Sequence, residues 1–166
     1  MNAEQDNGGS NGRSASAGSF TTAALLWTLI ALFALRVLGQ AVQRWWPHSF
    51  LPPFDAFQGS GLGYPLLLSA QLIILALLVR AALRVGAGTF GPGPRQRRIL
   101  TGFSALYMAG SVLRIAIGLA LPAAPHWFTA WIPAFFHLVL AAFVIILALH
   151  ARRCVPDSAP KPGAGA

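Results

Sequence analysis

The chain has 166 residues, of which 55% are hydrophobic and 10% are charged, with a mean hydropathy of +0.61 and a net charge of +8. This composition is too apolar for a soluble domain and predicts a membrane protein. The basic balance does not indicate a nucleic-acid partner, because most arginines lie beside apolar runs, where membrane topology explains them. A single cysteine, Cys154, excludes a disulfide or a redox pair within the chain.

Both ends of the chain are polar. Residues 1–19 lack the basic start of a signal peptide, because acidic residues precede the first arginine, and we expect them to form a retained, disordered cytoplasmic tail. Residues 154–166 are rich in Pro, Gly and Ala and predict a second disordered tail. The membrane domain is therefore expected to cover residues 20–153.

Four apolar stretches in this domain are long enough to cross a bilayer, which takes about 20 helical residues. They cover residues 20–42, 64–85, 99–121 and 130–151. We therefore predict an all-α fold, a bundle of four transmembrane helices.

The distribution of charge predicts the orientation of the bundle. Arginines are concentrated around the second loop and after the last span, whereas the first loop has only Arg44 and the third has none. The positive-inside rule then places both termini and the second loop in the cytoplasm. Five aromatic residues gather at the opposite, outer interface, namely Trp45, Trp46, Tyr64, Trp127 and Trp131. Abundant Ala, Gly, Arg and Pro with a single lysine indicate a high-GC bacterium, so we predict a multi-pass protein of the bacterial inner membrane.

A weak internal repeat relates the two halves of the chain. Residues 35–37 (LRV) recur as residues 113–115 (LRI), and the Pro-His pair at residues 47–48 recurs at residues 125–126. This pattern predicts two pseudo-repeated hairpins related by an axis along the membrane normal.

Two arginines, Arg36 and Arg114, lie in the outer halves of the first and third predicted spans. A guanidinium keeps its charge at ordinary pH and is costly in hydrocarbon, so each needs compensation. One explanation is that both side chains snorkel to the outer headgroups. The other is a polar cluster at the same depth that includes Gln40, Gln71, Tyr107, Ser111 and His137. Gly110 and Gly118 flank Arg114 and would let a backbone or a ligand approach closely.

The predicted spans contain no carboxylate that would neutralise these arginines. We expect Asp55, in the first loop, to fold in and pair with Arg36 or Arg114, which would clamp the loop; an anionic ligand headgroup is the alternative counter-ion. We interpret His137 as a hydrogen-bonded structural residue, and no ligand spacing in the sequence predicts a metal or a cofactor. No motif predicts catalytic residues.

Three segments carry a resemblance: RVLGQ at residues 36–40, FQGSGLGYPLLLSAQLIIL at residues 57–75 and WIPAFFHLVLAAFVI at residues 131–145. Together they resemble a family of small, uncharacterised four-helix integral membrane proteins of bacteria. Gly59, between Gln58 and Ser60, departs from the pattern of that family. The resemblance implies a fold and no activity.

From the sequence we expect a non-enzymatic binding or accessory protein whose polar cluster holds a loop, a partner helix or an anionic lipid-like ligand. The expected partners are membrane lipids and another membrane subunit or a second copy of the chain, without nucleic acid. The alternative is a small transporter or membrane enzyme that engages an anionic, lipid-like or quinone ligand at the same cluster. That alternative predicts a polar cavity opening outward beside both Arg36 and Arg114, whereas the accessory role predicts that Asp55 fills this space.

Overall fold

The computed structural model describes residues 9–58, 62–121, 123 and 125–153. Within these residues there are four long helices, two short helices and no strand, so the predicted all-α fold is confirmed. The helices are α1 (Gly9–Trp45), α2 (Phe54–Phe57), α3 (Tyr64–Gly86), α4 (Pro94–Ala120), α5 (His126–Thr129) and α6 (Trp131–Arg153). The four long helices each contain a segment that is long and apolar enough to cross a membrane, close to the predicted spans.

The start of α4 lies at Pro94 rather than at residue 99. Proline suits a first helical position, since its fixed φ is helical and its missing N–H needs no partner there. The side chain of Gln96 accepts a hydrogen bond of 3.2 Å from the backbone N–H of Gly93 and caps the helix. The predicted start of this helix lies too late, because the first residues of α4 include three arginines and the prediction followed apolar residues.

The first helix extends well beyond its apolar part. It begins at Gly9 and so includes residues 9–19, a stretch predicted from the sequence to belong to a disordered tail. This stretch is rich in Gly and Ser, which are poor helix formers, but extending an existing helix avoids the cost of nucleation. Residues 1–8 and 154–166, the remainder of the two predicted tails, lie outside the described residues.

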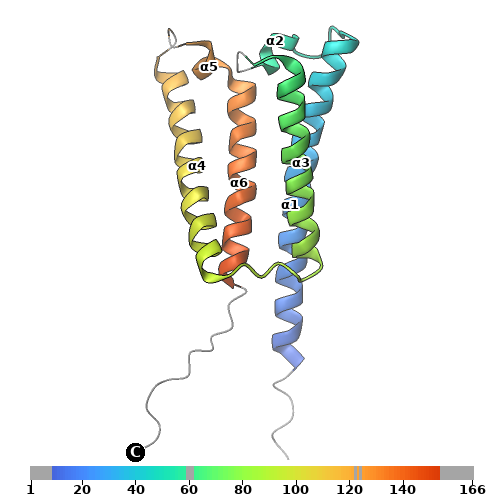
Figure 1. Ribbon diagram of the computed structural model, residues 1–166, viewed down its shortest axis with the longest axis vertical. Helices are drawn as coiled ribbons and strands as arrows, with labels where there is room; N and C mark the ends of the chain where they lie inside the picture. The colour runs from blue at the N-terminus through green and yellow to red at the C-terminus, as the bar shows by residue number, and fades with distance from the viewer. Residues whose placement is uncertain (1–8, 59–61, 122, 124, 154–166) are drawn as a thin grey trace, which may run out of the picture.

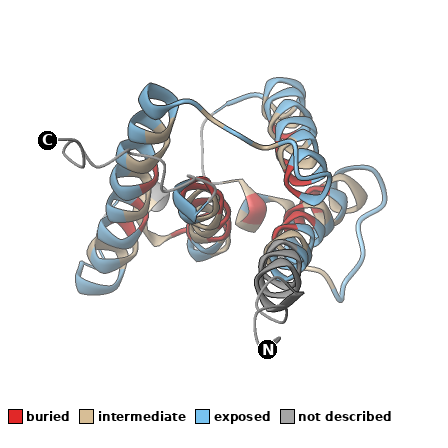
Figure 2. Cartoon of the chain, turned by 90° about the horizontal axis from the view of Figure 1, so that it is seen from below, coloured by how far each residue is buried: buried red, intermediate tan, exposed pale blue. Residues whose placement is uncertain are grey.

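The long helices run alongside one another and form two hairpins (Figure 1). α1 packs on α3, α4 packs on α6, and the contact between α1 and α6 joins the two pairs. Seen along the bundle, α4 lies to one side of α6 while α1 and α3 lie to the other (Figure 2). The short helices α2 and α5 lie together at one end, which we call the loop end. The beginning of α1, the α3–α4 connection and the end of α6 lie at the other, which we call the basic end.

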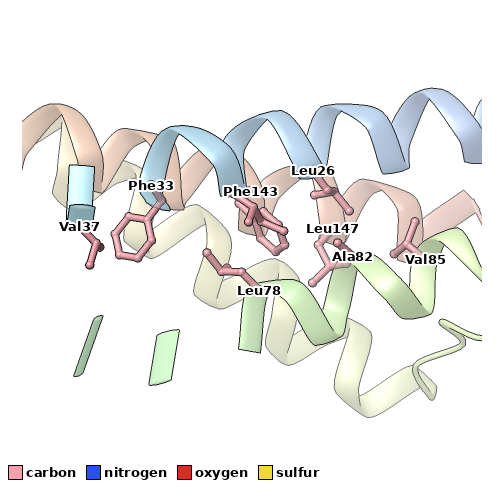
Figure 3. Packing of buried hydrophobic residues seen from close by; sticks show 9 residues of the cluster. Leu26, Phe33, Val37, Leu78, Ala82, Val85, Phe143 and Leu147 are labelled. Carbon is pink, nitrogen blue, oxygen red and sulfur yellow. The ribbon is translucent and has the colours of Figure 1, made fainter. Parts of the chain in front are cut away.

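The apolar core lies between α1, α3 and α6 (Figure 3). Leu26, Ile30, Phe33 and Val37 recur every three or four residues of α1 and so form one buried stripe. Residues from the two neighbouring helices face this stripe, namely Leu78, Ala82, Val85, Phe143 and Leu147. The outer faces of the helices expose many large apolar side chains, Leu106 among them at 75% exposure. Such a surface suits lipid far better than water.

Aromatic contacts hold the first loop against the helix ends. The ring of Tyr64 lies edge-on to Trp45 at 5.8 Å and to Phe54 at 5.4 Å between ring centroids. The guanidinium carbon of Arg44 lies 6.0 Å from the ring centroid of Phe54. These contacts position α2 over the loop end of α1, next to Arg36.

Candidate functional site

The first buried arginine, Arg36, bonds to the main chain of the loop. Its Nη2 donates a hydrogen bond of 3.0 Å to the carbonyl oxygen of Phe57, and its guanidinium carbon lies 5.4 Å from the ring centroid of Phe136 on α6. Both Arg36 and Phe57 are buried. The Nε atom of Arg36 has no hydrogen-bond partner among the described residues. Arg36 therefore ties α1, α2 and α6 together.

The expected pairing of Asp55 with Arg36 is wrong. Asp55 is exposed in the first turn of α2, and in the described part of the chain its carboxylate forms no ion pair with Arg36 or Arg114. Phe57 is the last residue of α2, where carbonyl groups lack a partner within the helix and carry partial negative charge. This carbonyl reaches Arg36 without burying a carboxylate. The loop is clamped as expected, but through its backbone.

Gln40 and Gln71 form a second polar contact, next to Arg36 along α1. The Nε2 of Gln71 donates a hydrogen bond of 3.0 Å to the Oε1 of Gln40 and so connects α3 to α1. Both side chains are buried, Gln40 completely. The Nε2 of Gln40 and the Oε1 of Gln71 have no partner in the described structure. The pair therefore depends on its single hydrogen bond.

Replacing one glutamine should cost more than replacing both. We expect Gln71→Leu to lower the free energy of unfolding by about 1 to 2 kcal/mol, because it leaves the buried amide of Gln40 without a partner. Adding Gln40→Leu should recover most of this loss. Unfolding in mixed micelles, followed by circular dichroism, measures both effects. A double variant that costs the sum of the two single changes would show that the glutamines act independently.

The second buried arginine, Arg114, lies beside His137 of α6. Its Nη1 lies 3.3 Å from the Nδ1 of His137, and the same Nδ1 lies 2.6 Å from the carbonyl oxygen of Pro133. Since a carbonyl oxygen can only accept, we assign the proton of the neutral ring to Nδ1, which leaves Nε2 as an acceptor. The hydrogen bond to Pro133 agrees with the structural role expected of His137 and fixes the orientation of its ring.

Tyr107 and Ser111 lie on the same side of α4 as Arg114. The hydroxyl of Ser111 donates a hydrogen bond of 2.8 Å to the backbone carbonyl of Tyr107. The Tyr107 ring stacks on Phe103 at 5.8 Å and lies 6.2 Å from the His137 ring, both measured between centroids. The Tyr107 ring therefore lies between α4 and His137 of α6.

These side chains line a cavity of about 360 Å³ between α4 and α6, which we call the Arg114 cavity. Its lining residues are Phe103, Leu106, Tyr107, Gly110, Ser111, Arg114 and His137. Gly110 keeps the cavity open, because no atom lies within 4 Å of the position that a Cβ would occupy there. Most of the wall is apolar, and the charged group is the guanidinium of Arg114.

The structure therefore divides the eight predicted residues. Tyr107, Ser111, Arg114 and His137 come together in the Arg114 cavity, whereas Arg36, Gln40 and Gln71 lie outside its lining and Asp55 is exposed on α2. Phe57 and Phe136, the neighbours of Arg36, were missed from the sequence. The available signal was that both aromatic residues belong to the segments that carry the family resemblance.

Gly118 brings a loop backbone against α4. A Cβ at this position would overlap the carbonyl oxygen of Phe128, the residue of α5 nearest to it. The close backbone approach that the glycines flanking Arg114 suggested therefore occurs at Gly118, while Gly110 opens the cavity.

Comparisons with known proteins do not identify this site. Searches of protein-family models, curated proteins and solved structures return no match to this chain. The family resemblance read from the sequence therefore stays a prediction, and function has to be argued from the geometry of the site.

Proposed function

We propose that this chain is a multi-pass protein of the bacterial inner membrane, with the basic end of the bundle in the cytoplasm. The four apolar helices and their exposed apolar faces support a membrane location. The arginines near the basic end support the orientation, as do the exposed Trp45, Trp46 and Trp131 at the loop end. These arginines are Arg80, Arg84, Arg95, Arg97, Arg98, Arg152 and Arg153.

The two hairpins are proposed to be diverged copies of one unit. Each consists of a long helix, a short helix and a second long helix, and each has an arginine in the loop-end half of its first long helix. In the first hairpin, Arg36 binds the backbone of α2. In the second, Arg114 lines a cavity. One copy of the arginine then stabilises the fold, and the other is placed to meet a ligand.

The proposed function is non-enzymatic binding of an anionic amphiphile in the Arg114 cavity. The observation that carries this proposal is a largely apolar cavity of about 360 Å³ with one permanently charged guanidinium in its wall. This volume lies within the range of roughly 300 to 1,000 Å³ that is typical of small-molecule sites. Apolar walls accommodate an alkyl or isoprenoid body, while the guanidinium of Arg114 favours a carboxylate or phosphate head. The hydroxyl of Tyr107, also in the lining, adds a hydrogen-bond donor for that head.

The character of the walls favours binding over transport. A path for a polar solute through a bilayer needs polar groups along its length. The lining of the Arg114 cavity is mostly apolar, and it includes neither Arg36 nor the two buried glutamines. The transporter or enzyme alternative predicts a polar cavity beside both arginines. The Arg114 cavity differs from this prediction, because its wall is mostly apolar and contains only one of the two arginines.

Binding of a matched pair of amphiphiles tests the proposal. We expect the full chain in mild detergent to retain dodecanoate, observed by native mass spectrometry, about tenfold better than its neutral methyl ester, because only the acid pairs with Arg114. Arg114→Gln should abolish this preference. Gly110→Leu should weaken the binding of both the acid and the ester, because the leucine side chain fills the cavity.

Ala76→Leu is the matched control, because it adds bulk at an exposed position of α3 outside the cavity. It should leave the retention of dodecanoate unchanged. Equal retention of acid and ester by the unchanged protein, or equal losses in Gly110→Leu and Ala76→Leu, would refute binding in the Arg114 cavity.

A further inference from the structure

A second cavity, of about 520 Å³, lies at the basic end between the beginning of α4 and the end of α6. Its lining residues are Pro94, Arg97, Arg98, Thr101, Gly102 and Arg152. We call it the arginine cavity. It shares no residue with the Arg114 cavity and lies toward the opposite end of α4.

Side chains from two helices build the arginine cavity. The Nε of Arg152, on α6, donates a hydrogen bond of 3.4 Å to the hydroxyl of Thr101, on α4, which holds the α6 arginine beside the two α4 arginines. The Nε of Arg97 is buried and has no partner among the described residues. Gly102 leaves its part of the wall open, because no atom lies within 4 Å of a Cβ placed there.

Three guanidinium groups therefore share one cavity without an acidic neighbour in the described chain. Among the residues that the structure describes, the one acidic residue is Asp55, which lies on α2 at the loop end, away from this cavity. Like charges held together repel, and a bound anion relieves this repulsion. The planar fork of a guanidinium matches the oxygens of a phosphate, to which it donates paired hydrogen bonds.

The surface beside the arginine cavity suits an acyl chain. Continuing along the same side of α4 toward the loop end, Ala105, Ala109 and Val112 follow Thr101 and Gly102 at helical spacing. All three are exposed and apolar. A ligand that occupies the arginine cavity and also covers this apolar surface has a phosphate at the end of the bundle and a hydrocarbon chain along α4.

We propose that the arginine cavity binds the phosphate headgroup of an anionic phospholipid, with an acyl chain along α4. Basic pockets between helices at the cytoplasmic surface bind such headgroups by charge and by hydrogen bonding. The bound lipid would bridge α4 and α6 at the end where the chain passes from one hairpin to the other. The inference requires the bundle to lie in a membrane but does not depend on a ligand in the Arg114 cavity.

Native mass spectrometry of the full chain, titrated with phosphatidylglycerol and with phosphatidylcholine of the same acyl chains, tests this site. We expect phosphatidylglycerol to bind about tenfold more tightly. Arg97→Gln combined with Arg98→Gln on α4 should remove this preference. Arg152→Gln on α6 should remove it as well, and this variant tests the site if the double variant does not fold. Inorganic phosphate at millimolar concentration should not displace the lipid, because it lacks the acyl chain.

The matched control removes two arginines from the same end of the bundle but outside the cavity. Arg80→Gln combined with Arg84→Gln on α3 makes the same change in net charge. It should retain the preference for phosphatidylglycerol. If both double variants lose this preference equally, the attraction of the anionic lipid is diffuse over the basic end, and the proposed site is refuted. Displacement by inorganic phosphate would assign it to the free anion and would also overturn the proposal.

Discussion

Replacing Arg36 should destabilise the protein far more than replacing Asp55. We expect Arg36→Ala to lower the free energy of unfolding by about 2 to 3 kcal/mol, because it removes a charged hydrogen bond to the Phe57 carbonyl and the contact with the Phe136 ring. Asp55→Ala, at an exposed position, should change it by less than about 0.5 kcal/mol. Equilibrium unfolding in mixed micelles measures both values.

The double variant distinguishes this arrangement from an ion pair. If the backbone carbonyl is the partner of Arg36, the effects of Arg36→Ala and Asp55→Ala should add. Arg36→Lys should recover only part of the stability, because an ammonium lacks the planar face that stacks on Phe136. Similar losses in the two single variants, with a double change that costs less than their sum, would restore Asp55 as the counter-ion.

The second large effect is expected at Gly118. We expect Gly118→Ala to destabilise the protein by about 1 to 3 kcal/mol, because the new Cβ overlaps the Phe128 carbonyl and the shift needed involves backbone. The loss should appear as weaker hydrogen-exchange protection of the α4–α6 connection, together with a lower unfolding midpoint.

Gly110→Ala is the control on the same helix. No atom lies within 4 Å of a Cβ at Gly110, and alanine has the higher helix propensity, so this change should be neutral or slightly stabilising. Equal destabilisation by the two changes would mean that helix flexibility, rather than the contact with α5, explains the glycine at residue 118.

Arg36 and Arg114 are both buried arginines, but their surroundings differ. Arg36 has a main-chain carbonyl and an aromatic ring, which together account for how α1 holds α2. Arg114 lies in the wall of a cavity beside His137. The proposed binding of an anionic amphiphile depends on that cavity and on its guanidinium. The arginine cavity at the basic end adds a separate place for a lipid headgroup.

Much of the architecture could be predicted from the sequence, because the length and apolarity of a segment are local properties. The four long apolar helices follow from runs of about 20 residues that have no other way to satisfy their backbone in hydrocarbon. The stripe of Tyr107, Ser111 and Arg114 follows from helical spacing alone. The need to compensate Arg36 and Arg114 follows from the chemistry of the guanidinium, whatever the fold.

The tertiary structure decided which atoms provide that compensation. Asp55 is the nearest acid in the sequence, but the direction of α2 turns its carboxylate outward and its last carbonyl toward Arg36. The predicted single cluster became two groups because α6 lies between α4 and the α1–α3 pair (Figure 2). Spacing along one helix cannot determine which helices become neighbours, since this depends on the packing of all four.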